Sequence, residues 1–251
     1  MSIVQTFYDD MATQYDKLFL DWQATTREQA ALLDRLFSGQ GFSPSARVLD
    51  CACGIGTQAI GLAALGYAVT ASDISRGELA QAKERAKANQ VTIAFHRADF
   101  RNLADTFQET FDIILAMDNA LPHMLTAEDL DTAIGSITAR LAPNGIFVAS
   151  IRDYDALLLT KPPYSPPYIH DTEGGRRVCF QTWDWQGENY RLTQYIIEDE
   201  ASLKAGKFLC EYRATCREEM TTLLRKHGCR EVTWLMPRET GFYQPIVIAR
   251  K

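Results

Sequence analysis

Hydrophobic positions in the first part of the chain recur at helical spacing. Apolar and aromatic side chains return every three or four residues over residues 3–19, which predicts one helix there. A second helix is predicted to begin near Thr25, because Thr25 and Glu28 match the capping-box pattern, and to continue through Leu36. A stretch rich in glycine and serine at residues 38–44 then ends the helical part.

From residue 47 onward, short apolar runs alternate with helical patterns. The predicted strands cover residues 48–50, 67–72, 91–95, 111–116 and 146–151. The predicted helices between them cover residues 57–65, 76–89 and 126–141. The run at residues 111–116 is almost entirely apolar, as expected of a buried central strand. This alternation predicts an α/β fold with a Rossmann-like, doubly wound sheet that binds its ligands at the carboxyl ends of its strands.

The pattern changes after Asp153. Residues 161–168 are rich in proline, which excludes a regular helix or a central strand. Three strand-like runs follow and predict an antiparallel insert folded over the active-site edge; they cover residues 177–185, 190–198 and 207–214. A helix at residues 217–227 and strands near residues 232–235 and 246–249 then resume the alternating pattern.

This pattern predicts four parts of the chain. They are an N-terminal helical cap (1–42), a ligand-binding core (43–155), the antiparallel insert (156–214), and a C-terminal helix with a strand pair that completes the core sheet (215–251).

Composition narrows the range of partners. The 251 residues carry a formal net charge of -6 and no run of lysine and arginine, which disfavours a nucleic-acid partner. The first ten residues are polar and no apolar stretch is long enough to span a bilayer, so we expect a cytoplasmic protein with no membrane partner. Because no export signal is present, we expect the six cysteines to be reduced, and their spacing predicts no metal site. The oligomeric state does not follow from the sequence.

The most informative segment is the glycine loop at residues 48–57, Val-Leu-Asp-Cys-Ala-Cys-Gly-Ile-Gly-Thr. Its glycines allow a sharp turn and a close approach of a ligand to the start of a helix. Gly54 and Gly56 also fit the loose dinucleotide fingerprint. However, the carboxylate of Asp50 would repel a pyrophosphate and attract a cationic amino group. S-adenosylmethionine fits better than NAD, because it carries a sulfonium and an ammonium but no phosphate.

This loop resembles the first motif of class I S-adenosylmethionine-dependent methyltransferases, with Ala52 where many members have glycine. The resemblance implies that Asp73, which ends the second strand, holds the ribose hydroxyls, and that Ile74 packs on the adenine. It places Asp99 near the adenine amine, although a simple loop cap is the alternative. The cofactor-binding residues predicted in this way are Tyr15, Trp22, Arg27, Asp50, Ala52, Gly54, Gly56, Asp73, Ile74, Asp99, Phe100 and Met117.

The predicted cofactor-binding residues include aromatic residues of the N-terminal region, because this region is expected to close over the cofactor. Tyr8, Tyr15 and Trp22 would present rings or hydroxyls near the sulfonium, and Arg27 would meet the methionine carboxylate. Core packing is the alternative for aromatic side chains at helical spacing.

The segments after the fourth and fifth strands resemble those of glycine and glycine/sarcosine N-methyltransferases. They read Met-Asp-Asn-Ala-Leu-Pro-His from Met117 and Ser-Ile-Arg-Asp-Tyr-Asp from Ser150. The resemblance implies that Asn119 orients the acceptor amine and Arg152 binds its carboxylate, whereas Asp153 departs from the family's asparagine. The alternative for Arg152 is an ion pair with a neighbouring aspartate.

The predicted function is methyl transfer from S-adenosylmethionine to a small soluble acceptor, with the amine of glycine or sarcosine as the leading candidate. Asn119, His123, Arg152 and Tyr8 are the predicted catalytic residues, and Tyr8, His123 or water would take the proton. His123 has the alternative role of bracing its loop. An O- or S-methyltransferase, a non-catalytic S-adenosylmethionine-binding protein and an NAD-linked oxidoreductase are the alternatives.

Overall fold

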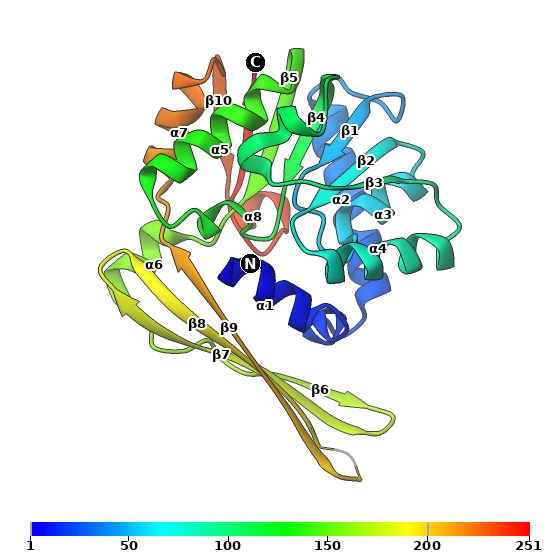
Figure 1. The fold of residues 1–251 in the computed structure, drawn as a ribbon, viewed down its shortest axis with the longest axis vertical. Coiled ribbons are helices and arrows are strands. Elements are labelled where there is room, and N and C mark those ends of the chain that lie inside the picture. Colours follow the sequence, from blue (N-terminus) through cyan, green and yellow to red (C-terminus); the bar gives the residue numbers. More distant parts are fainter. Residues whose placement is uncertain (1, 200) are drawn as a thin grey trace.

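The computed structural model describes residues 2–199 and 201–251, which form two β-sheets (Figure 1). The larger sheet has seven strands in the order β10-β11-β5-β4-β1-β2-β3. These strands are β1 (Arg47–Asp50), β2 (Ala68–Asp73), β3 (Ala94–Arg97), β4 (Phe111–Ala116), β5 (Leu141–Ser150), β10 (Glu231–Leu235) and β11 (Ile246–Arg250). Strands β1 to β5 pair in parallel, whereas β11 runs antiparallel to β5 and β10 antiparallel to β11.

Helices cover both faces of this sheet, because alternate residues of each strand point to opposite sides. Val48 points to one face of the sheet and packs there with α2 (Trp22–Gly39), α3 (Thr57–Ala64) and α4 (Arg76–Ala88). Leu49 packs in the other core, together with the 3-10 helix η2 (Phe100–Asp105), α5 (Ala127–Ala139) and α7 (Arg217–Lys226). The predicted Rossmann-like sheet is therefore confirmed.

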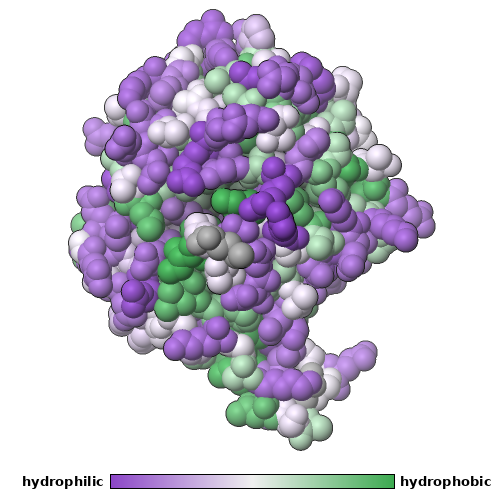
Figure 2. Space-filling view, in the orientation of Figure 1, coloured by the Kyte–Doolittle hydropathy of each residue, from purple (hydrophilic) through white to green (hydrophobic). Residues whose placement is uncertain are grey.

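The second sheet is antiparallel and contains β6 (Tyr168–Thr172), β7 (Gly175–Gln186), β8 (Asn189–Asp199) and β9 (Leu203–Arg213). Figure 1 shows it as an arm that extends away from the larger sheet. The predicted antiparallel strands are confirmed, but β6 was not predicted. It begins at Tyr168, the residue that follows the last proline of the proline-rich segment, so its N–H groups are available to pair with β7. The surface drawn in Figure 2 is mostly hydrophilic, with hydrophobic atoms gathered near the arm and at its projecting end.

The N-terminal segment lies between the two sheets (Figure 1). The single helix predicted over residues 3–19 is wrong: α1 (Ile3–Met11) ends early and a 3-10 helix, η1 (Tyr15–Leu18), follows. The two pieces bind different partners. Asp9 Oδ1 accepts hydrogen bonds from Ser75 Oγ at 2.6 Å and the Gly77 N–H at 2.9 Å, whereas Lys17 Nζ lies 2.6 Å from Glu198 Oε2 of β8. These tertiary contacts outweigh the local helical pattern.

Several other element boundaries differ from those predicted. Helix α2 begins at Trp22 instead of near Thr25, because the Asp21 carboxylate accepts the Ala24 N–H at 2.9 Å and caps the helix one turn earlier. Strand β3 starts at Ala94, three residues later than predicted. Four short helices were not predicted: η2, η3 (Leu121–His123), α6 (Tyr154–Thr160) and α8 (Pro237–Thr240). No helix among residues 2–199 and 201–251 is long and apolar enough to cross a membrane.

We predict that Gly61→Ala destabilises the protein by about 1–3 kcal/mol. A Cβ atom at Gly61 would lie 2.6 Å from the Ala30 Cβ and 2.7 Å from the Thr26 carbonyl oxygen, so α2 and α3 would have to separate. Gly39→Ala is the matched control, because a Cβ at this helical position meets no atom within 4 Å. Urea denaturation should show a lower midpoint for the first variant only, and equal midpoints would contradict the packing argument.

Candidate functional site

A cavity lies at the carboxyl ends of strands β1, β2 and β4, the edge that the sequence predicts for ligand binding. Ten of the predicted site residues line it: Tyr8, Tyr15, Ala52, Gly54, Asp73, Ile74, Asp99, Phe100, Met117 and His123. The cavity therefore combines residues of the N-terminal segment with the tips of the parallel strands.

The glycine loop is held in place by Asp73. Gly54 and Gly56 have φ values of 51° and 92°, in the left-handed region that favours glycine. A Cβ at Gly56 would lie 2.8 Å from the Ile60 Cδ1 atom, so Gly56 supports the loop from behind and does not line the cavity. Asp73 Oδ2 accepts the Gly54 N–H at 2.9 Å, and its Oδ1 accepts the Ser75 N–H at 2.9 Å. The Asp73 carboxylate thereby joins the tips of β1 and β2.

Carboxyl groups beneath the loop make the site favourable for a cation. Asp50 is buried; its Oδ1 accepts the Ala52 N–H at 3.4 Å, and its Oδ2 has no partner among the described residues. Burial raises the pKa of Asp50 to about 8, and burial also raises the pKa of Asp73 and Glu78. A cationic ligand would stabilise the ionised form of these acids.

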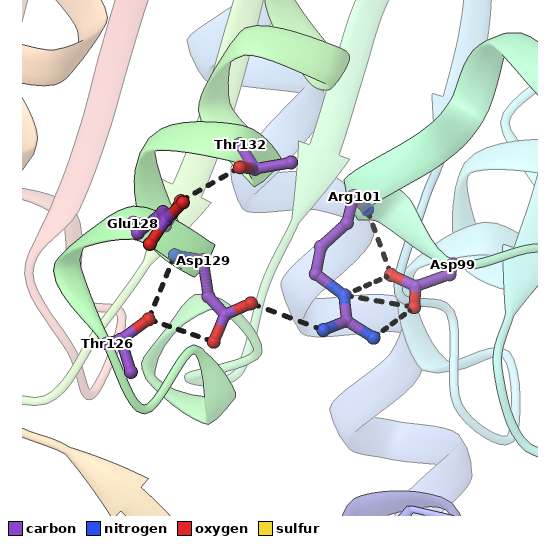
Figure 3. Close-up of polar contacts among 6 residues, drawn as sticks. All are labelled: Asp99, Arg101, Thr126, Glu128, Asp129 and Thr132. Carbon is purple, nitrogen blue, oxygen red and sulfur yellow. Dashed lines mark hydrogen bonds and ion pairs between the residues drawn. The ribbon is translucent and has the colours of Figure 1, made fainter.

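An arginine bridge crosses one wall of the cavity (Figure 3). Arg101 Nη2 lies 2.6 Å from Asp99 Oδ2, and its Nη1 lies 3.4 Å from Asp129 Oδ1. Asp99 also accepts the Arg101 N–H at 2.9 Å and caps η2. Asp99 thus lines the cavity and caps η2 at the same time. Arg101 and Asp129 are not predicted from the sequence, because nothing in the local pattern indicates that α5 approaches η2.

His123 and Tyr8 form a hydrogen-bonded pair. His123 Nδ1 lies 3.2 Å from the Glu211 carbonyl oxygen and 3.5 Å from Cys210 Sγ. In the tautomer that donates Nδ1–H to the carbonyl oxygen, Nε2 accepts the Tyr8 hydroxyl proton, at an Oη–Nε2 distance of 2.9 Å. Burial, which is the main cause, lowers the pKa of His123 to about 4. His123 is consequently neutral near pH 7 and orients the Tyr8 hydroxyl.

At the tip of β4, the side chains of Asp118 and Asn119 have separate environments. Asn119 is buried: its Nδ2 donates to Tyr154 Oη at 3.0 Å, and its Oδ1 accepts the Arg152 N–H at 3.0 Å. Asp118 lines the cavity, where its Oδ1 accepts a hydrogen bond from Tyr243 Oη at 2.7 Å. The sequence predicts Asn119 as a site residue, but Asp118 lines the cavity, because one residue of register at a strand tip decides which side chain faces it.

Arg152 lies in an aromatic and polar cage next to the cavity. Its Nη1 donates to Tyr190 Oη at 2.6 Å and its Nη2 to Gln181 Oε1 at 2.9 Å. The guanidinium carbon lies 4.9 Å from the ring centroid of Trp183. The alternative of an ion pair with Asp153 or Asp155 is wrong, because both aspartates pair with Arg217 of α7.

Trp22 and Arg27 lie away from the cavity. The Trp22 Nε1 donates to Thr57 Oγ1 at 2.9 Å, and the Arg85 guanidinium carbon lies 4.8 Å from the Trp22 ring centroid. Trp22 and Arg27 both line a second hollow, between α2 and α3. Eight of the twelve predicted cofactor residues therefore line the cavity, whereas Trp22 and Arg27 line the second hollow and Asp50 and Gly56 line neither.

Residues 48–145 match the family described as a methyltransferase domain. A glycine/sarcosine N-methyltransferase from Parasynechococcus marenigrum (strain WH8102) is 30% identical over 154 residues, which cover 61% of this chain and 53% of that protein. The chain thus spans about half the length of this curated relative.

Two solved structures share the fold over almost the whole chain. An S-adenosylmethionine-dependent methyltransferase from Clostridium acetobutylicum ATCC 824 has a TM-score of 0.76 and 16% identity, and the match covers 97% of this chain and 98% of that one. CalS10, an amino pentose methyltransferase from Micromonospora echinaspora, has a TM-score of 0.72 and 21% identity, with 90% and 91% covered. The chain shares the fold of these S-adenosylmethionine-dependent methyltransferases of known structure, and its residues 48–145 match the model of a methyltransferase domain.

We predict that Asp50→Asn changes how stability depends on pH. The folded pKa of about 8 lies above the ordinary value of 3.8, so the folded state binds more protons than the unfolded state between these values. Stability from this group is present below pH 4 and is lost as pH rises through 8. Between pH 5.5 and 8.5 the unliganded wild type should lose at least about 1 kcal/mol relative to the variant.

Chemical denaturation at the two pH values measures this difference. Glu109→Gln, at an exposed position, is the control and should follow the wild type. Parallel pH profiles for wild type and Asp50→Asn would refute the assignment of Asp50 as a buried, protonated acid.

Proposed function

We propose that this protein is an S-adenosylmethionine-dependent methyltransferase that methylates the nitrogen of a small amine. The observation that carries the proposal is the glycine loop fixed by Asp73 above the buried acids Asp50 and Glu78. Asp50 Oδ2 and both carboxylate oxygens of Glu78 lack hydrogen-bond partners within the described part of the chain. Acids that ionise when a cation binds beside them fit a cofactor that carries a sulfonium and an ammonium better than one that carries phosphates.

The residues of this chain would hold the cofactor along the tips of β1, β2 and β3. The Asp73 oxygens accept hydrogen bonds from ribose hydroxyls, Ile74 packs on the adenine, and Asp99 lies near its amine. S-adenosylmethionine supplies an electrophilic methyl group on a good leaving group, so the protein has to position the acceptor and exclude water. Tyr8 and Tyr15 contribute to this exclusion by closing the cavity from the N-terminal segment.

Nitrogen is favoured as the acceptor atom by the curated relative, which is a glycine/sarcosine N-methyltransferase. Arg152 provides a further reason to propose an acceptor with a carboxylate, such as glycine or sarcosine. It has no acidic partner among the ion pairs of residues 2–199 and 201–251, and its contacts with Tyr190 and Gln181 are to neutral groups. A carboxylate would pair with it bidentately if Gln181 moved aside.

We predict that Asp73→Ala weakens S-adenosylmethionine binding roughly 10- to 100-fold, because hydrogen bonds from two hydroxyls to a charged group are lost. Titration calorimetry with S-adenosylmethionine measures the affinity. Asp171→Asn, an exposed change on the arm, is the matched control and should bind as the wild type does. An unchanged affinity for the Asp73 variant would rule out the proposed ribose contact.

We also predict that the wild type transfers label from S-adenosylmethionine to an amino acid, and that Arg152→Ala reduces this transfer at least about 100-fold through loss of a buried charge pair. The assay panel contains glycine, sarcosine, dimethylglycine, other amines, thiols and phenols. Arg191→Ala, whose side chain is half exposed on β8, is the control. Transfer only to a thiol or phenol would exclude an amine acceptor, and binding without any transfer would exclude an enzyme.

A further inference from the structure

The order of the strands divides the cavity into two halves. Neighbouring strands β1, β2 and β3 carry the glycine loop, Asp73 and Asp99 at their carboxyl ends, whereas β4, β5 and β11 lie on the other side of β1. A doubly wound sheet binds its ligands where the strand order reverses, and here this point lies between β1 and β4. The proposed cofactor residues occupy the first half. A residue at the tip of β4 therefore borders the acceptor.

Asp118 is at this border. Its carboxylate accepts two hydrogen bonds, from Tyr243 Oη at 2.7 Å and from Gln58 Nε2 at 2.7 Å. Tyr243 belongs to the segment before β11 and Gln58 to α3, so the two donors approach from the two halves of the cavity. Both donors are neutral, and no ion pair found among residues 2–199 and 201–251 includes Asp118. Two hydrogen bonds thus orient the carboxyl group at the cavity wall, and no cation of the described residues pairs with it.

The backbone fixes the direction of the Asp118 side chain. Asp118 and Asn119 have φ values of 56° and 70°, in the left-handed region. Ser150 of β5 holds this turn: its Oγ accepts the Asp118 N–H at 2.7 Å, and its carbonyl oxygen accepts the Asn119 N–H at 3.0 Å. Because Asn119 is buried in its contact with Tyr154, the preceding side chain is presented to the cavity.

We propose that Asp118 binds the amine of the methyl acceptor and makes the enzyme selective for nitrogen. This inference rests on the proposed function. A neutral amine donates an N–H to the Asp118 carboxylate, and its lone pair forms the bond to the methyl carbon. The sulfur takes the electrons of the breaking carbon–sulfur bond and becomes a neutral thioether. The positive charge that develops on nitrogen is stabilised by the carboxylate, and the product ammonium then loses its proton to water.

The test is Asp118→Asn, a change that preserves the fold. Asparagine is among the few residues that tolerate a left-handed φ. Its Oδ1 can accept the hydrogen bond from Gln58, and its Nδ2 can donate a hydrogen bond to the Tyr243 hydroxyl. We expect kcat/KM for the preferred amine to fall roughly 100-fold, the typical effect of removing one stabilising group from a developing charge. We expect affinity for S-adenosylhomocysteine, measured by calorimetry, to change less than about 3-fold, within about 0.7 kcal/mol.

The outcomes separate this inference from the proposed function. Unchanged kcat/KM for the amine in Asp118→Asn would overturn the inference alone. A parallel loss of S-adenosylhomocysteine affinity would also overturn it, because Asp118 would then hold the cofactor. Absence of transfer by the wild type to any amine, thiol or phenol would overturn the proposed function itself. Glu109→Gln, an exposed acid far from the strand tips, is the matched control and should retain full activity.

Discussion

The site depends on the two hydrogen bonds that backbone N–H groups donate to Asp73. One comes from Gly54 in the loop after β1 and the other from Ser75 at the start of α4, so a single carboxylate fixes two strand tips. Because both donors are backbone groups, their positions follow from the glycine loop and the cap of α4. The other cavity walls are built around this fixed corner.

The N-terminal segment connects this corner to the arm. Asp9 binds the first turn of α4 through Ser75 and Gly77, and Lys17 pairs with Glu198 on β8. Tyr8, the residue before Asp9, is hydrogen-bonded to the buried His123. The segment is therefore positioned by contacts with both sheets. The helical propensity of the segment has less influence on its structure than these contacts. This explains why residues 3–19 form two short helices instead of the single helix predicted.

Burial of ionisable groups near the cavity lowers the free energy of unfolding. The raised pKa values of the acids and the hydrogen bonds of Arg152 limit this loss. Asp50 and Glu78 are buried acids with unpartnered oxygens in the described ranges, and burial raises the pKa of each. Arg152, in contrast, is surrounded by Trp183 and by neutral hydrogen-bond acceptors. The buried acids and the buried arginine thus lie in different parts of the site, an arrangement that suits a cationic cofactor next to the acids and an anionic group next to Arg152.

The sequence by itself determined the parallel sheet, the glycine loop and Asp73, because each follows from local periodicity or from a short motif at a fixed position in the strand order. Only the tertiary structure decided which of two neighbouring residues at the tip of β4 faces the cavity. Asp118 and Asn119 differ by one position, and the left-handed turn held by Ser150 selects between them. The partner of Arg101 on α5 likewise depends on packing between distant elements, which no local pattern encodes.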